Sequence, residues 1–251
     1  MDNPLSMYFK SFRLPTMAAL TDDAIRKAEA EDWGYRRFLT YLCESEYQDR
    51  QRRRTERLLK AACLPEGKTL ANLDEGLLPI KIRRMLPSLL DGTFVENREN
   101  LLCFGLPGRG KTHFAAAVGR ELVVRHGLNV LFTPSARLME RLLRAREGLL
   151  LEKELKRLDK FDLVIVDELG YMEHRRDEME LFFHFLANCY ERRSLIICSN
   201  LVFSQWGERI FKDAMTGMAA VDRLVHHGII LEFTNLSVRE QQAKEKPGLI
   251  S

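Results

Sequence analysis

The segment from residue 105 to residue 112 constrains the fold of this chain more than any other. It reads Gly-Leu-Pro-Gly-Arg-Gly-Lys-Thr, follows a short apolar run at 101–104 and precedes a helical pattern over 111–126. Glycines let backbone N–H groups approach phosphate oxygens closely, and the positive N-terminal end of the next helix attracts the same charge. The spacing G-x-x-x-x-G-K-[ST] between a strand and a helix therefore predicts an α/β domain that binds ATP.

The loop and the residue after it are the predicted cofactor-binding residues. They are Gly105, Leu106, Pro107, Gly108, Arg109, Gly110, Lys111, Thr112 and His113. We expect the Lys111 ammonium to hold the β and γ phosphates, and the Thr112 hydroxyl to complete the coordination of a Mg²⁺ ion. The alternative is a glycine-rich turn that binds no nucleotide.

A second motif ends in two carboxylates. Residues 161–168 read Phe-Asp-Leu-Val-Ile-Val-Asp-Glu, an apolar strand followed by Asp167 and Glu168. We expect Asp167 to hold Mg²⁺ through its water shell, and Glu168 to polarise the water that attacks the γ phosphorus. A buried strand that merely ends in solvated acids is the alternative.

Asn200 follows the next apolar run, at 195–199. If this strand lies between the other two, the Asn200 amide reaches the γ phosphate and senses it. An Asn at the end of a strand is also a common turn residue.

Short apolar runs alternate with longer amphipathic stretches, which is typical of a parallel sheet built from βαβ units. The predicted strands are 101–104, 129–133, 163–166, 195–199 and 229–233, and the predicted helices are 111–126, 135–148 with a continuation to 158, 177–192 and 214–227. Residues 24–62 are predicted to be helical, and Pro65, Gly67, Gly76 and Pro79 then interrupt the pattern. We therefore expect a helical N-terminal domain over 1–70 that binds DNA or a partner, and an ATPase domain over 71–251.

Basic charge is concentrated in two places, although 39 basic and 36 acidic residues give a net charge of only +3. One run holds Arg50, Arg52, Arg53, Arg54, Arg57 and Lys60, and the other holds Arg137, Arg141 and Arg144 at positions i, i+4 and i+7 of a helix, with Arg146 beside them. Either cluster predicts contact with DNA phosphates. A solvated helix face is the alternative for both.

The cysteines and the apolar runs indicate the cellular compartment of the protein. Five scattered cysteines form no C-x-x-C pair, which favours buried thiols in a reducing compartment. No apolar run approaches the length of a membrane span, and the N-terminus lacks the apolar core of a signal peptide. We expect a cytoplasmic protein without membrane partners.

From residue 13 to residue 239 the chain resembles the IstB-like AAA+ ATPases, which are helpers of insertion-sequence transposons and relatives of the DnaC helicase loaders. The resemblance rests on these segments: Arg13-Leu14-Pro15-x-Met17, Glu99-Asn100-Leu101, Lys111-Thr112-His113, Asp167-Glu168-Leu169-Gly170-Tyr171, Ser199-Asn200-Leu201, Phe203-Ser204-x-Trp206-Gly207 and Asp222-Arg223-Leu224-Val225-His226-His227.

The resemblance implies a parallel five-stranded sheet of order 5-1-4-3-2, with Asn200 as the sensor of the γ phosphate. It also implies a homo-oligomer, ring or helical, in which Arg223 acts as an arginine finger at a neighbour's ATP. From the residues alone, Arg223 is equally a surface or ion-paired arginine. Only 18 residues follow position 233, too few for a full C-terminal helical lid. Arg239 either replaces the lid's sensor arginine or is a tail residue.

Four functions compete. The first is an ATP-dependent regulator of DNA transposition that oligomerises on duplex DNA and recruits or activates a transposase; whether it bends the DNA stays open. The second is a helicase loader that binds single-stranded DNA and a replicative helicase. The third is a small-molecule kinase, disfavoured because Glu168 beside Asp167 suits the activation of water. The fourth is a scaffold that binds ATP without turnover.

Overall fold

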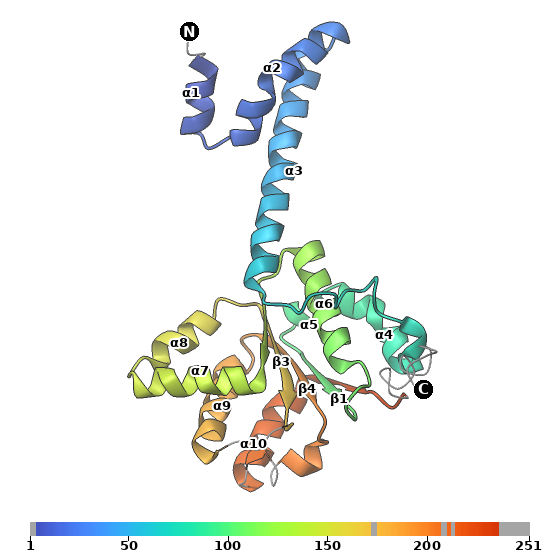
Figure 1. Ribbon diagram of the computed structural model, residues 1–251, viewed down its shortest axis with the longest axis vertical. Coiled ribbons are helices and arrows are strands. Elements are labelled where there is room, and N and C mark those ends of the chain that lie inside the picture. The colour runs from blue at the N-terminus through green and yellow to red at the C-terminus, as the bar shows by residue number, and fades with distance from the viewer. Residues whose placement is uncertain (1–3, 172–174, 207–209, 212–213, 236–251) are drawn as a thin grey trace, which may run out of the picture. The chain divides into compact units, whose positions relative to one another are not determined.

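The computed structural model describes residues 4–171, 175–206, 210–211 and 214–235 (Figure 1). The chain divides into two compact units, Met1–Arg57 and Leu58–Ser251. The sequence placed this division near residue 70. It lies earlier because Leu58, Leu59 and Leu64 already pack against a core cluster of the second unit.

The first unit is helical. Its helices are α1 (Pro4–Ser11), α2 (Pro15–Ala30) and α3 (Tyr35–Ala61), the last of which continues into the second unit. The buried Glu46 carboxylate of α3 accepts hydrogen bonds from the backbone N–H groups of Thr16 (2.8 Å) and Met17 (3.1 Å). Those N–H groups have no partner within α2, so Glu46 caps this helix and ties it to α3.

The second unit contains a sheet of five parallel strands. They are β1 (Asn100–Phe104), β2 (Val130–Pro134), β3 (Leu163–Leu169), β4 (Ser194–Ser199) and β5 (Gly228–Glu232). The order β2-β3-β4-β1-β5 confirms the predicted order 5-1-4-3-2, read from the opposite edge. Every residue of β1 and β4 is buried, as expected for strands covered on both faces.

Helices cover the two faces of this sheet in separate layers (Figure 1). One face carries α4 (Ile80–Leu90), α5 (Thr93–Glu96) and α6 (Lys111–His126), and the other carries α7 (Ser135–Glu147), α8 (Leu151–Leu158), α9 (Arg176–Cys189) and α10 (Ala214–Val225). Two short 3₁₀ helices span Glu75–Leu77 and Phe203–Gln205. Successive residues of β1 contribute to opposite layers: Leu101 and Cys103 to the α6 side, Leu102 and Phe104 to the α9 side.

Two predicted helical stretches are interrupted. The stretch over 24–62 breaks between Ala30 and Tyr35, where Asp32 adopts a positive φ of 50°. The stretch from 135 to 158 divides into α7 and α8 at Leu149, where φ is 54°. A left-handed residue cannot continue an α-helix, so each such position ends one helix and lets the next take a new direction.

An aromatic contact links helix α6 to the end of the sheet. The Phe114 ring meets the Phe233 ring edge-on at a centroid distance of 5.5 Å, and both side chains are fully buried. Phe233 also lies against the turn that follows β1, since a Cβ added to Gly105 would come within 2.5 Å of the Phe233 carbonyl oxygen. This packing fixes the position of the loop formed by residues 105–110.

We predict that Phe114→Ala lowers the free energy of unfolding of the second unit by about 3–5 kcal/mol, because it leaves a cavity in a close-packed core. Val124→Ala is the matched control, since Val124 lies on the same helix and is 51% exposed. It should change stability by about 0.5 kcal/mol or less. Urea unfolding followed by Trp206 fluorescence in a Trp33→Phe background reports the second unit alone. Equal losses in the two variants would contradict this packing.

Candidate functional site

The glycine-rich loop joins β1 to α6 at the carboxyl edge of the sheet. Gly105, Gly108 and Gly110 have φ angles of 151°, 81° and 88°, values that other residues rarely adopt. Helix α6 begins at Lys111, directly after Gly110. The N–H groups of its first turn therefore face the concavity that the loop encloses, which is the arrangement that binds phosphate in other proteins.

Lys111 is held over this loop. Its Nζ donates hydrogen bonds to the carbonyl oxygens of Gly105 (2.6 Å) and Leu106 (3.0 Å). Burial lowers the pKa of the Lys111 ammonium from its ordinary value, and the carboxylate of Asp167 partly opposes that effect. The loop carbonyls thus keep a partly desolvated cation beside the predicted phosphate position.

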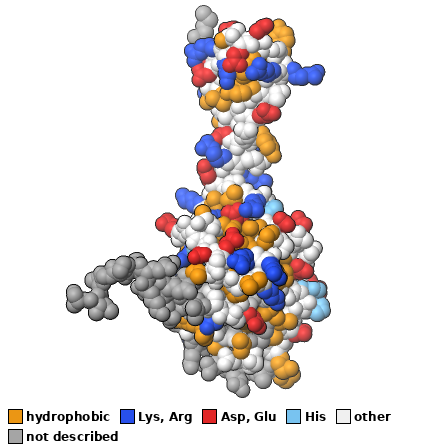
Figure 2. Space-filling view, turned by 90° about the vertical axis from the view of Figure 1, so that its right-hand side faces the viewer, with side chains coloured by type: hydrophobic (Ala, Val, Ile, Leu, Met, Phe, Trp, Pro, Cys, Tyr) orange, Lys and Arg blue, Asp and Glu red, His pale blue; other side chains and the backbone are white. Residues whose placement is uncertain are grey.

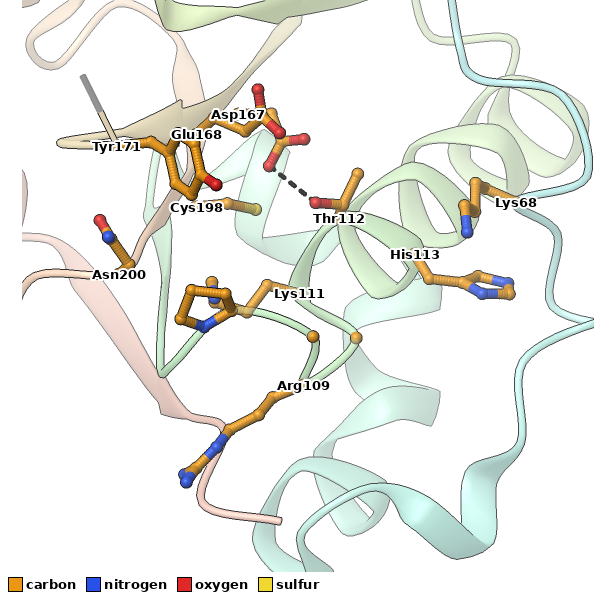
Figure 3. Close-up of a pocket in the computed structure, with 13 residues that line it drawn as sticks. Lys68, Arg109, Lys111, Thr112, His113, Asp167, Glu168, Tyr171, Cys198 and Asn200 are labelled. Carbon is orange, nitrogen blue, oxygen red and sulfur yellow. Dashed lines mark hydrogen bonds between the residues drawn. The ribbon is translucent and has the colours of Figure 1, made fainter. Parts of the chain in front are cut away.

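Asp167 and Thr112 meet across the loop. The Thr112 hydroxyl donates to Oδ1 of Asp167 at 3.1 Å (Figure 3). Asp167 is only 4% exposed, and burial raises the pKa of its carboxyl group. A hydroxyl and a carboxylate are hard oxygen donors of the kind that Mg²⁺ takes alongside water and phosphate oxygens. These two residues therefore fit the metal role predicted for them.

The Glu168 side chain points in a different direction from that of Asp167 because β3 is irregular at these residues. The register of β3 with β4 shifts between Val166 and Leu169, and Glu168 has a positive φ of 60°. The shift leaves Asp167 buried and Glu168 exposed at the cavity. Bulges and strained residues are frequent at functional sites, since they re-aim a single side chain.

Asn200 follows β4, the strand between β3 and β1. Its position places it between the two carboxylates and the glycine-rich loop (Figure 3). Its Oδ1 atom is buried and accepts no hydrogen bond from any described residue. A buried acceptor of this kind is costly unless a partner arrives, and a bound ligand or its water would supply one.

These residues line one cavity of about 210 Å³, the nucleotide cavity. Its lining is Lys68, Tyr171, Cys198, Asn200, Asp167, Glu168 and every residue from Pro107 to His113. Gly105 and Leu106 are not part of this lining; their carbonyls hold Lys111 instead.

Sequence reasoning missed Lys68, Tyr171 and Cys198. Lys68 reaches the cavity because Nε2 of His113 pairs with the Thr69 carbonyl oxygen at 2.9 Å, which draws the connection after α3 toward α6. Lys68 lies beside His113 in Figure 3. No local pattern around Lys68 signals this contact. Tyr171, by contrast, stood in a segment already singled out, three residues after Glu168.

Arg223 lies outside the nucleotide cavity of its own chain. It is on α10, where its Nη1 donates to the Ala219 carbonyl oxygen at 3.1 Å and its guanidinium stacks over the Phe183 ring at 4.8 Å. It makes no ion pair with a described residue. The guanidinium therefore has no counter-ion among the described residues.

Most of the predicted DNA-contacting arginines are already engaged by carboxylates. Arg50 pairs with Glu46, Arg52 and Arg53 with Asp49, Arg141 with Glu154, Arg144 with Glu140, and Arg146 with Asp177. The hydrogen bond from Arg52 is the largest cause that lowers the pKa of Asp49, to about 2. On the face shown in Figure 2, basic and acidic side chains are interspersed.

Three of these arginines, Arg54, Arg57 and Arg137, differ from the rest because they form no ion pair with a described residue. Arg54 and Arg137 are exposed, and neither forms an ion pair with any residue that the structure describes. Arg57 is also exposed and donates its Nε to the Arg53 carbonyl oxygen. Arg239 lies outside the described residues.

Comparison with known proteins decides the family. The family model described as IstB-like ATP binding protein matches residues 8–246. The chain belongs to the IstB-like ATP-binding family.

Relatives agree with this assignment along most of their lengths. The chain is 39% identical over 242 residues to an insertion sequence ATP-binding protein of Sinorhizobium fredii, covering 96% of this chain and 80% of that one. It is 35% identical to the ATP-binding protein of insertion sequence IS21 from Pseudomonas aeruginosa, with 98% and 92% covered. The IS5376 protein of Geobacillus stearothermophilus is 34% identical, with 95% of each chain covered.

Solved structures share the fold. The DnaC helicase loader superposes with a TM-score of 0.53 at 19% identity, covering 61% of this chain and 88% of that one. AMPPCP-bound DnaA from Aquifex aeolicus gives 0.56 at 18% identity, with 75% and 58% covered. This chain therefore has the AAA+ fold. Across its described residues, none of the helices has the length and apolar character needed to cross a membrane.

The raised pKa of Asp167 leads to a prediction about stability. A carboxyl whose pKa is higher in the folded protein binds its proton more tightly there, so its stabilising effect is complete at low pH and is lost as the pH rises through the folded pKa. At neutral pH the buried carboxylate is therefore unfavourable. Without nucleotide, Asp167→Asn should raise the thermal unfolding midpoint at pH 7, and the gain should shrink as the pH falls toward the carboxyl range.

The exposed Asp91→Asn variant is the control for the loss of a carboxylate outside the cavity. Scanning calorimetry of both variants between pH 4 and pH 8 measures the effect. A less stable Asp167→Asn protein at pH 7 would mean that the Thr112 hydrogen bond outweighs the desolvation of Asp167.

Proposed function

We propose that this protein is an ATP-dependent, DNA-binding AAA+ regulator of DNA transposition. In this proposal it hydrolyses ATP, oligomerises on duplex DNA and recruits or activates a transposase. The observation that carries the proposal is the convergence of Lys111, the Thr112–Asp167 pair, Glu168 and Asn200 on one cavity. Membership in a family whose relatives are named for insertion sequences supplies the biological setting.

Each residue of the cavity has its own role in the hydrolysis of ATP. When ATP enters, the Lys111 ammonium breaks its hydrogen bonds to the loop carbonyl oxygens and binds β and γ phosphate oxygens instead. The N–H groups at the start of α6 also bind the phosphates. Thr112 and Asp167 would hold Mg²⁺, whose positive charge would offset the negative charge of the phosphates. Glu168 accepts a hydrogen bond from the attacking water, and Asn200 orients that water against the γ phosphate.

A cationic group is missing from one side of this cavity. Lys111 and Lys68 bring positive charge to the cavity from the glycine-rich loop and from the connection after α3, whereas Glu168, Tyr171 and Asn200, at the ends of β3 and β4, are not positive. Arg109 is turned away, because its Nη1 donates to the Phe233 carbonyl oxygen at 3.1 Å (Figure 3). Charge that develops on the transferred phosphoryl group needs a positive partner. We propose that Arg223 of a neighbouring copy supplies it.

Contact with DNA phosphates is assigned first to Arg54, Arg57 and Arg137, which are exposed and carry no carboxylate partner among the described residues. The paired arginines must give up an ion pair before they can bind phosphate. For exposed pairs such as Arg144–Glu140 this costs roughly 1 kcal/mol or less, so they remain available as secondary contacts.

The test of this function separates binding from hydrolysis on DNA. Lys111→Ala should fail to bind ATP and, by itself, fail to assemble on duplex DNA. Glu168→Gln keeps the shape of the site but removes the group that polarises water, so it should assemble with ATP, remain assembled longer and hydrolyse ATP about 10²–10⁴-fold more slowly.

Sedimentation and electron microscopy of each variant, with duplex or single-stranded DNA and with or without ATP, measure assembly. Phosphate release measures turnover. Assembly on single-stranded DNA alone would replace the transposition regulator with a protein of the helicase-loader kind. Wild-type turnover in Glu168→Gln would assign the activation of water to another residue.

A mixing experiment tests the shared active site. Arg223→Ala should bind ATP but not hydrolyse it, whereas Lys111→Ala lacks a working cavity but offers an intact Arg223. Mixed at equal concentration with DNA, the two should recover part of the wild-type turnover, because one copy's Arg223 completes the other copy's cavity. Co-assembly without recovered turnover at any ratio would return Arg223 to a structural role on α10.

A further inference from the structure

Three side chains able to bind a metal ion gather at the edge of the sheet opposite the nucleotide cavity. Glu191 lies in the turn between α9 and β4, and His226 and His227 lie between α10 and β5. Each segment leads into the start of a parallel strand, whereas the nucleotide cavity lies where such strands end. Strand β1 lies between β4 and β5 and fixes one segment directly, because the Asn100 N–H donates to the His227 carbonyl oxygen at 2.7 Å.

The distances suit one small cation. A candidate ligand atom from each of Glu191, His226 and His227 lies within 4.8 Å of the other two. Nε2 of His227 is 3.6 Å from Oε1 of Glu191, and the two imidazole rings are 4.2 Å apart between centroids. Ligands about 2.0–2.1 Å from a tetrahedral Zn²⁺ ion lie roughly 3.3 Å from one another. Small rotations of exposed side chains would bring the three into that geometry.

Neighbouring groups orient these ligands and favour a positive ion beside them. Nδ1 of His226 pairs with the Tyr190 hydroxyl at 3.2 Å, which orients the ring and leaves Nε2 for a metal ion. Glu191 has a positive φ of 54° in the α9–β4 connection, and its side chain is exposed. The histidines directly follow the last residue of α10, where the negative end of the helix dipole favours a cation. The nearby Arg192 and Arg193 are both paired with Asp159 and so repel a cation less.

We propose that Glu191, His226 and His227 form a binding site for a divalent transition-metal ion, with Zn²⁺ the best match. Two imidazoles and one carboxylate suit this class of ion, whereas Mg²⁺ prefers oxygen ligands alone. All three side chains are exposed, so water fills the fourth position. The bound ion ties the end of α10 to the turn before β4. This site does not depend on the proposed function and takes a different ion from Thr112 and Asp167.

Zinc titration of tag-free, chelator-treated full-length protein tests the site. The expected result is one Zn²⁺ per chain, observed by calorimetry, with no competition from millimolar Mg²⁺. His226→Ala, His227→Ala and Glu191→Gln should each weaken Zn²⁺ binding at least tenfold. His184→Ala, which removes an exposed histidine of α9 outside the group, should leave the affinity unchanged.

Two exposed thiols, Cys43 and Cys63, could also bind Zn²⁺, so the titrations are repeated in a Cys43→Ser, Cys63→Ser background. Visible absorption of bound Co²⁺ reports whether the ion is four-coordinate. Circular dichroism and ATP binding check that each variant is folded. Loss of the Zn²⁺ signal in the serine background, or equal affinity in wild type and both histidine variants, would overturn the site.

Discussion

Burial of charge at the carboxyl edge of three adjacent strands is the constraint on which the nucleotide site depends. Because β3, β4 and β1 are neighbours, Asp167, Asn200 and the loop after β1 must share one small space. There, burial raises the pKa of Asp167 and lowers that of Lys111, so both charged forms are disfavoured. In the proposed function, polyphosphate would stabilise the charged form of Lys111, and a divalent cation would stabilise that of Asp167.

The nucleotide motifs were predictable because they depend on local signals, whereas the order of the strands was implied by the resemblance to the IstB-like AAA+ ATPases. Residues 105–113, 167–168 and 200 each follow a recognisable apolar strand, and the carboxyl ends of parallel strands meet at one edge. Lys68 was not predictable, since it enters through the contact of His113 with Thr69, which joins residues 44 positions apart. Cys198 lines the cavity only because its strand lies in the centre of the sheet.

The state of the surface arginines was predictable in part. Arg52 with Asp49 and Arg144 with Glu140 are three and four residues apart on a helix, a spacing that can be recognised in the sequence. Arg141 with Glu154 joins two helices whose relative direction depends on the positive φ of Leu149, and no periodicity signals that turn. A cluster of basic residues in the sequence therefore predicts more free positive charge for binding DNA than the folded protein has, because several of its members pair with carboxylates.

In the proposed assembly, Arg223 would connect the geometry of one subunit to the chemistry of the next. Its guanidinium is held on α10 by Phe183 and the Ala219 carbonyl oxygen, so it is oriented before any neighbour arrives. An arginine prepared in this way loses little conformational freedom when it meets the γ phosphate of the next copy. The cavity, for its part, offers Glu168, Asn200 and Tyr171 on the side that lacks a cation. In the proposed assembly, Arg223 of one copy would complete the cavity of the next, so hydrolysis would depend on the contact between copies.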